Sequence, residues 1–173
     1  MVKKLKKNSE YFIYLCGILL FSSVLLISAE VVLRKFFLFS FGAADELSGY
    51  VLGIIISWSL TYVLFEKMHI RIDVIYEKVS NKSKKLFDVI AMFFTFCFSL
   101  LLTYFSYDVV YTSIIKNSTA NTPLGTPLWI PQLIWWLGFA FFSIVVFILL
   151  VMSIRTFFNN KSNDYTSVSK EQS

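Results

Sequence analysis

The residues of this sequence that could do chemistry are few, and their spacing assembles no catalytic or metal site. His69 is the single histidine, so a histidine pair for a metal ion or a haem is not available. Cys16 and Cys97 lie far apart and form no CxxC arrangement, which is typical of small buried thiols and not of a redox pair. No GxSxG, HExxH or P-loop pattern is present. The sequence therefore predicts a protein that is not an enzyme and has no cofactor and no bound metal.

The composition of the chain predicts an integral membrane protein. Of its 173 residues, 57% are hydrophobic, 19 are Phe and only 16% are charged, whereas about 25% are charged in ordinary soluble domains. A soluble core of this size could not bury so much apolar surface. The elements that position any functional side chain are therefore expected to be membrane-spanning, and no nucleic-acid partner is expected.

Runs without charged residues predict how often the chain crosses the membrane. Such runs occupy residues 11–29, 47–65, 89–107 and 128–154. A hydrocarbon core about 30 Å thick needs about 20 helical residues, and a helix satisfies its own backbone groups where water is absent. We expect an all-α transmembrane domain over residues 1–158, with spans at about 11–33, 46–65, 86–112 and 128–154. The polar residues 159–173 are expected to form a disordered cytoplasmic tail.

The first apolar run has a second interpretation, as a cleaved signal peptide, because the basic stretch MVKKLKK precedes it. The apolar segment of a signal peptide has about 7–15 residues, and this run is longer. Residues 27–29 resemble a cleavage site only loosely. We therefore expect a retained membrane anchor.

The distribution of Lys and Arg predicts the orientation of the spans, because basic residues concentrate on the cytoplasmic side. With four crossings, 13 of the 16 basic residues fall on one side, and only Arg34, Lys35 and Lys116 fall on the other. Both termini and residues 65–85 are therefore expected in the cytoplasm. The loops 34–45 and 113–128 are expected outside.

The stretch FEKMHIRIDVIYEKVSNKSKK, residues 65–85, is charged and half-apolar, unlike the spans on either side. Its apolar residues Met68, Ile72, Ile75 and Val79 recur at helical spacing, and a basic face follows beside them: Lys67, Arg71, Lys78 and Lys82. This pattern favours an amphipathic helix lying in the membrane surface, with its basic face against anionic lipid headgroups. Two alternatives stay open, a plain basic loop and a short extended segment from Met68 to Val74.

Several acidic residues lie near the ends of the predicted spans. Glu30 and Arg34 are four apart at the outer end of the first span and can pair on one helical face. Asp45 and Glu46 open the second span, where the helix macrodipole favours negative charge. Asp108 has no cation near it in sequence and is expected to face protein or water.

The second span carries candidates for a helix–helix contact with a partner. Gly49, Gly53 and Ser57 recur at every fourth position, and small residues at this spacing let another helix approach closely. Trp58 must place its indole N–H against something other than lipid tails, most simply a partner protein. The outer loop before the fourth span contains Pro123, Pro127 and Gly125 and is expected to be stiff and irregular.

The order of these elements resembles the small permease subunit of tripartite ATP-independent periplasmic (TRAP) transporters, the DctQ-like family. The resemblance covers roughly residues 11 to 155. Its stretches are EVVLRKFF, ADELSGYVLG, MHIRIDVI and TPLGTPLWIPQLIWWLGF. By resemblance, Arg34 and Glu46 match the Arg and Glu of the family. His69, Arg71 and Asp73 match its H-x-R/K-x-D segment.

The resemblance implies a specific assembly in a bacterial inner membrane. A large transmembrane permease subunit would hold the substrate and sodium sites, and a periplasmic binding protein would deliver an organic acid, such as a C4-dicarboxylate or sialic acid. This chain would be the fixed scaffold. The apolar and basic stripes of residues 65–85 and the charge split add the hypothesis that this segment is a brace on the membrane surface. The alternative is a self-sufficient four-span exporter that uses Glu30 as its proton-coupled site.

Overall fold

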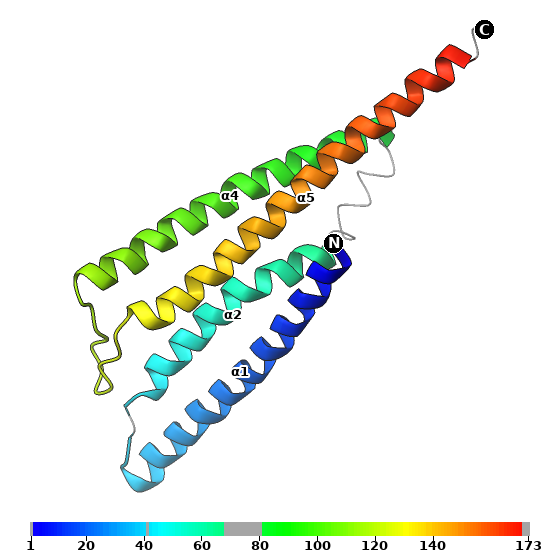
Figure 1. Cartoon of the computed structure of the whole chain (residues 1–173). Coiled ribbons are helices and arrows are strands. Elements are labelled where there is room, and N and C mark those ends of the chain that lie inside the picture. Colours follow the sequence, from blue (N-terminus) through cyan, green and yellow to red (C-terminus); the bar gives the residue numbers. More distant parts are fainter. Residues whose placement is uncertain (1, 41, 68–80, 171–173) are drawn as a thin grey trace.

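The structure, a computed structural model, describes residues 2–40, 42–67 and 81–170 (Figure 1). Within these ranges it is all-helical, and all of its helices are long and apolar enough to cross a membrane. Their bounds are Val2–Phe37 for α1, Ala44–Lys67 for α2, Asn81–Ile115 for α4 and Trp129–Lys170 for α5. The predicted four-helix fold is confirmed. The predicted surface helix falls mainly on residues 68–80, which lie outside the described part of the chain, as do His69, Arg71, Asp73 and Lys78.

The ends of the helices follow from local backbone chemistry. Asn117 adopts φ +46° just after α4, and Asn tolerates this left-handed conformation better than most residues. The N–H of Ser118 donates to the Ser113 carbonyl at 3.0 Å, and the N–H of Asn117 donates to Ile114 at 3.2 Å. This pair of bonds is the Schellman motif that ends many helices. At the start of α5, Pro131 lies in the first turn, where a missing backbone N–H has no cost.

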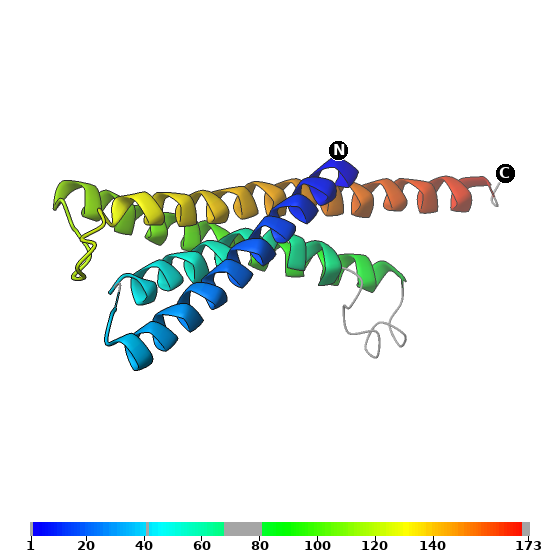
Figure 2. The same ribbon diagram turned by 90° about the horizontal axis from the view of Figure 1, so that it is seen from below.

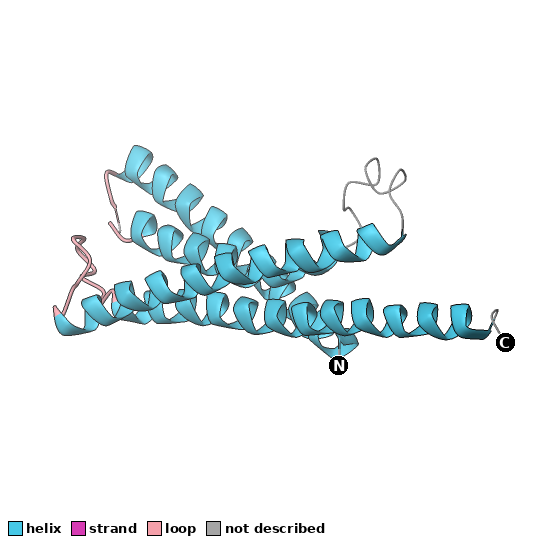
Figure 3. Ribbon diagram, turned by 90° about the horizontal axis from the view of Figure 1, so that it is seen from above, coloured by secondary structure: helices cyan, strands magenta, loops and turns pink. Residues whose placement is uncertain are grey.

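The helices lie in the spatial order α1, α2, α5, α4, since α1 packs on α2, α2 on α5, and α5 on α4 (Figure 1). α1 is inclined to the other helices and crosses over them (Figure 2). Both termini lie at one end of the bundle, and the loops after α1 and α4 lie together at the other (Figure 3). We call the end with these two loops the outer end.

The buried core is centred on α5. A cluster of buried apolar side chains joins α2, α4 and α5: Phe65, Met92, Val145, Leu149 and Leu150. In contrast, α1 and α4 expose large apolar side chains along their lengths, such as Ile18, Phe21, Phe94 and Phe105. So much exposed apolar surface is stable only where lipid tails replace water. The distribution of burial therefore agrees with a membrane-spanning bundle whose edge helices face lipid.

Helix α5 continues well beyond the apolar run that predicted it. It ends at Lys170, so the expectation of a disordered tail is wrong for residues 159–170. The physical reason is the absence of a helix breaker, because residues 155–170 contain neither Pro nor Gly. How deeply each helix lies in the membrane stays a prediction.

Candidate functional site: the outer clamp and the α2–α5 contact

Glu46 is the centre of a polar cluster at the outer end. It lies in the first turn of α2, and its side chain is 8% exposed. The Tyr50 hydroxyl donates to Glu46 Oε1 at 2.8 Å, and the Thr122 hydroxyl donates to Glu46 Oε2. The macrodipole explains why an acid is favourable at this position. The tertiary structure adds a second role, because Glu46 joins α2 to the loop between α4 and α5.

That loop, residues 116–128, is more ordered than its sequence suggested. Thr119 and Pro127 form an antiparallel bridge, and the Ala120 N–H donates to the Thr126 carbonyl at 2.9 Å. At its tip the Gly125 N–H donates to the Thr122 carbonyl at 3.0 Å. This bond closes the β-turn Thr-Pro-Leu-Gly, in which Pro follows the first residue as turn preferences require. The predicted stiffness of the loop thus comes from a closed hairpin-like shape.

The loop between α1 and α2 meets the same cluster. The Ser40 hydroxyl donates to Glu30 Oε1, and the Gly42 N–H donates to Ser40 Oγ at 3.2 Å. Gly42 has φ +64°, and a Cβ placed on it would lie 3.0 Å from Pro123 Cγ. Only Gly fits both constraints easily. We call these residues the outer clamp: Glu30, Ser40, Gly42, Glu46, Thr122 and Pro123.

The small-residue stripe of α2 packs partly on α5 of the same chain. A Cβ built on Gly138 of α5 would lie 2.5 Å from Ser57 Oγ, 2.8 Å from Ser57 Cβ and 3.0 Å from the Ser57 carbonyl carbon. Ser57 is fully buried and donates to the Ile54 carbonyl at 3.0 Å. The helices therefore approach each other closely at Ser57 and Gly138. Sequence reasoning did not single out Gly138, although a lone Gly in an apolar helix is a recognisable signal of close packing.

The other two positions of the stripe are more open. A Cβ on Gly53 would meet only Trp135 Cδ1, at 3.8 Å, and a Cβ on Gly49 would meet nothing within 4 Å. Both glycines border a groove of about 290 Å³, together with Val109, Pro131 and Trp135. The stripe thus has a packed inner end at Ser57 and an open outer end at Gly49.

Trp58 finds its hydrogen-bond acceptor inside the chain. Its indole N–H donates to the Ile134 carbonyl of α5 at 3.0 Å. Its ring stacks on Phe141 and packs against Phe12 of α1. The Trp58 N–H therefore does not need a partner protein as its acceptor, because a carbonyl of the same chain accepts its hydrogen bond. Trp58 joins α1, α2 and α5 in one aromatic cluster.

Helices α4 and α5 share a line of hydroxyl groups that the sequence analysis did not identify. Thr103 Oγ1 and Ser143 Oγ lie 2.8 Å apart, and the Ser143 hydroxyl also lies within 2.9 Å of the Ser99 carbonyl. The indole N–H of Trp136 donates to the Thr103 carbonyl at 3.2 Å. Small hydroxyl residues let two membrane helices approach and bond across their interface. This seam fixes α4 against α5.

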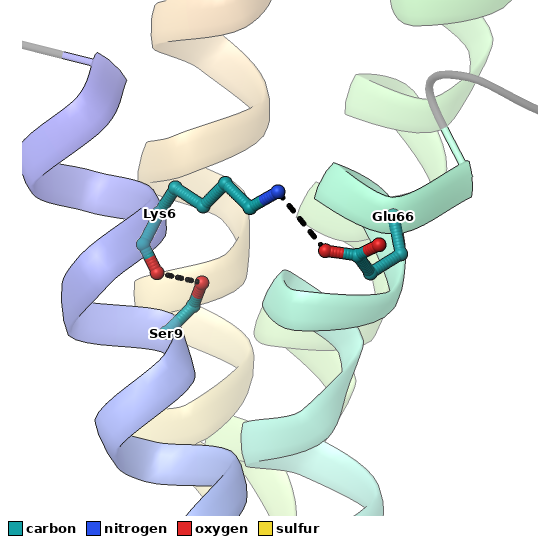
Figure 4. A network of polar contacts seen from close by, with 3 residues as sticks. All are labelled: Lys6, Ser9 and Glu66. Atoms are coloured by element: carbon teal, nitrogen blue, oxygen red, sulfur yellow. Dashed lines mark hydrogen bonds and ion pairs between the residues drawn. The ribbon is translucent and has the colours of Figure 1, made fainter.

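The opposite end carries an ion pair between α1 and α2. Lys6 Nζ lies 3.0 Å from Glu66 Oε1, and the Ser9 hydroxyl donates to the Lys6 carbonyl at 2.7 Å (Figure 4). Both partners of the pair are about half exposed, so water screens the pair and it contributes little to stability. Lys67 ends α2 and Lys82 lies in the first turn of α4, so these two members of the predicted basic face flank the segment that the structure leaves undescribed.

The two cysteines and the acidic residues of the described part of the chain are not gathered in one cluster. Cys16 and Cys97 are free, and Cys16 is buried. No group of three or more His, Cys, Asp or Glu side chains that could hold a metal ion occurs among the described residues. Arg34, four residues after Glu30, is exposed at the outer end of α1.

These features define a multi-pass α-helical membrane protein with two fixed outer loops and a continuous helical bundle. A profile of the family described as tripartite ATP-independent periplasmic transporters, DctQ component, matches residues 23–157. The chain belongs to this family, whose members are the small permease component of TRAP transporters. A comparison with curated proteins and a comparison with solved structures each gave no match.

Family membership confirms the resemblance on which Arg34, Glu46, His69, Arg71 and Asp73 were assigned. Of these, the structure describes Arg34 and Glu46. Glu46 is the residue that fixes the loop between α4 and α5, whereas Arg34 is exposed near the same end. No ion pair or hydrogen bond joins these two described side chains, and their roles in the transporter stay predictions.

Proposed function

We propose that this chain is the fixed scaffold subunit of a sodium-coupled importer of organic acids, such as C4-dicarboxylates or sialic acid. A large transmembrane permease subunit would hold the substrate and sodium sites, and a periplasmic binding protein would deliver the substrate. The observation that carries the proposal is the family match over most of the chain. Because the DctQ component is one part of a tripartite transporter, the chain is expected to act only with its partners.

The shape of the helices supports a scaffold role. Coupling-ion and substrate sites of secondary transporters are often built from helices that are interrupted at mid-membrane. Helices α1, α2, α4 and α5 are each continuous over their bounds. The outer clamp, the Ser57–Gly138 contact and the hydroxyl contacts between α4 and α5 join these helices through short, specific contacts. A bundle held in this way suits a subunit that stays still while a partner domain moves.

The open end of the α2 stripe is our candidate for contact with the large subunit. Gly49 and Gly53 border a shallow groove whose other walls are mainly apolar. Ser57 and Trp58, the other two candidates, already pack on α5. We therefore place the expected partner helix beside Gly49 and Gly53 and not beside Trp58. On the cytoplasmic side, the basic residues Lys67, Arg71, Lys78 and Lys82 would contact anionic lipids.

The first prediction concerns dependence on the partners. Cells that express this chain alone are expected to show no uptake of a labelled organic acid under a sodium gradient. Co-expression of the large permease subunit with the binding protein is expected to restore uptake, and omission of this chain should abolish it again. The measurement is initial uptake of the labelled acid in cells that lack other transporters for it.

The competing exporter hypothesis makes the opposite prediction. It requires that the chain alone confers resistance to a cationic drug and that Glu30→Gln abolishes the resistance. In the structure Glu30 is buried near the outer end and bonded to Ser40 of the adjacent loop, which is a structural role. Drug resistance from the chain alone would overturn the scaffold proposal.

The second prediction concerns orientation in the bacterial inner membrane, with both termini in the cytoplasm. We expect a Cys at Asn121, in a background with Cys16 and Cys97 replaced by alanine, to react with an impermeant thiol reagent added outside. Asn121 is exposed at the tip of the loop 116–128, so the reagent can reach it. A Cys at Asn81, at the opposite end of α4, should react only after the membrane is opened. Labelling of Asn81 in intact cells would reverse the orientation.

A further inference from the structure

The cytoplasmic half of α1 borders a groove that the proposed scaffold function does not use. The groove lies between α1 and α2 and has a volume of about 760 Å³. One face of α1 forms most of its wall, with Glu10 at one end and Ser22 at the other, and α2 contributes Tyr62. A Cβ on Gly17, in the middle of this wall, would meet nothing within 4 Å. The groove is therefore open to whatever lies beside α1 in the membrane.

Glu10 is a half-buried acid at the cytoplasmic end of the groove. Lys6, one turn before Glu10, interacts with it electrostatically, but the Lys6 ammonium group forms its ion pair with Glu66 at 3.0 Å. Among the residues that the structure describes, the Glu10 carboxylate is left without a direct ion pair. An acidic side chain on a membrane-spanning helix is costly and is a candidate for contact with a ligand or a partner. Lys7, three residues before Glu10 on the helix, is exposed and lies on a neighbouring part of the same surface.

The position of the groove matches one leaflet of the bilayer. The ion pair between Lys6 and Glu66 (Figure 4) is about half exposed, as suits charged groups at the level of the lipid headgroups, and the uncharged run of α1 begins directly after Glu10. From Glu10 to Ser22 the helix rises about 18 Å. Half of the hydrocarbon core is about 15 Å thick. A transmembrane helix of another protein would instead follow α1 over the full core, so the length of the groove favours a lipid.

The charges at the end of the groove select the headgroup. A carboxylate beside a lysine presents both signs of charge, which complements a zwitterionic headgroup. A primary ammonium group can donate hydrogen bonds to Glu10, whereas a trimethylammonium group has no N–H to donate. An anionic headgroup without an amine would face repulsion from Glu10. Phosphatidylethanolamine combines a primary ammonium group with a phosphate that Lys7 can attract.

We propose that the groove binds one phosphatidylethanolamine molecule of the cytoplasmic leaflet. Its ammonium group lies against Glu10 and its phosphate against Lys7. One acyl chain follows α1 past Tyr14, Gly17 and Phe21. Such a lipid fills the open side of the α1–α2 pair. Because α1 packs mainly on α2, the lipid would stabilise the position of α1 in the bundle.

The test measures which lipid the full-length chain retains. The chain is purified from nanodiscs that contain equal amounts of phosphatidylethanolamine and phosphatidylcholine, and native mass spectrometry counts the lipids that remain bound. We expect retention to favour phosphatidylethanolamine roughly tenfold, as one charge-assisted hydrogen bond would give. Glu10→Gln should bring the ratio close to one. Asp45→Asn, which removes an exposed acid at the outer end, is the matched control and should leave the ratio unchanged.

A second variant tests the acyl part of the site. Gly17→Leu fills the groove without altering a charge and should lower the retention of both lipids together. Circular dichroism checks that each variant keeps its helical content. A ratio near one for the unaltered chain, or an unchanged ratio in Glu10→Gln, overturns the proposal. It is also overturned if a cysteine at Tyr14 crosslinks efficiently to a large permease subunit and phosphatidylethanolamine is lost when the two chains assemble.

Discussion

Replacement of Gly138 by alanine is expected to lower the free energy of unfolding of this chain by about 3 kcal/mol, the upper end of the usual cost of overpacking. The added methyl group would lie 2.5 Å from Ser57 Oγ, 2.8 Å from Ser57 Cβ and 3.0 Å from the Ser57 carbonyl carbon. The hydroxyl can rotate away, but the main chain of α2 cannot move without separating from α5. Since α2 links α1 to the α4–α5 pair, a displaced α2 weakens the whole bundle.

The measurement is unfolding by sodium dodecyl sulfate, followed by circular dichroism. The double variant Gly138→Ala with Ser57→Gly should recover part of the loss, because it removes the two closest side-chain atoms and leaves the main-chain contact. Gly49→Ala is the matched control, since a Cβ at Gly49 has no neighbour within 4 Å. Its effect should be within about 0.5 kcal/mol. Equal stabilities of Gly138→Ala and Gly49→Ala would show that α2 and α5 do not approach closely here.

Replacement of Glu46 by alanine is expected to release the loop 116–128 from α2. The substitution removes the acceptor of two hydroxyl groups, those of Tyr50 and Thr122. Hydrogen bonds to a charged group contribute about 1.5–3 kcal/mol, so we expect the closed form of the loop to lose about 2 kcal/mol. That change corresponds to about 30-fold faster amide exchange.

Hydrogen exchange at Ala120, Gly125 and Leu128 measures this effect, because each of these amides donates a hydrogen bond within the loop. Thr122→Val should reproduce part of the increase, since it removes one of the two donors. Asp45→Asn serves as the control, because Asp45 is the exposed neighbour of Glu46 and leaves the outer clamp intact. If Glu46→Ala leaves these exchange rates unchanged, then the bridge between Thr119 and Pro127 holds the loop without help from α2.

The outer clamp gives the scaffold proposal a structural basis at the end of the bundle that, in the proposed orientation, would face the binding protein. Glu30 and Glu46 are each buried, and each accepts a hydrogen bond from the hydroxyl group of a loop residue. Gly42 of one loop lies against Pro123 of the other. Two loops that are far apart in the sequence therefore form one surface at the outer end. A fixed surface of this kind would present a constant shape to a soluble partner while the large subunit moves.

The sequence by itself determined the class of the protein, the number of spans and the family. The apolar runs are long enough for a bilayer, and a backbone in lipid must satisfy its hydrogen bonds within the same segment. These are local properties, so a pattern along the chain is sufficient to predict them. The split of 13 basic residues against 3 is also a property of the sequence alone, and the family motifs are short stretches within or beside the spans.

Only the tertiary structure decided which of the singled-out residues face each other. Glu46 and Thr122 are 76 positions apart, as are Trp58 and Ile134. The stripe of Gly49, Gly53 and Ser57 predicted a close helix–helix contact. It did not reveal that the contact would be made by Gly138 of α5 in the same chain. In a membrane, apolar residues face lipid and protein alike, so hydrophobicity does not say which side of a helix is packed. The packed side is set by shape and by hydrogen-bond partners, and these exist only when the helices are assembled.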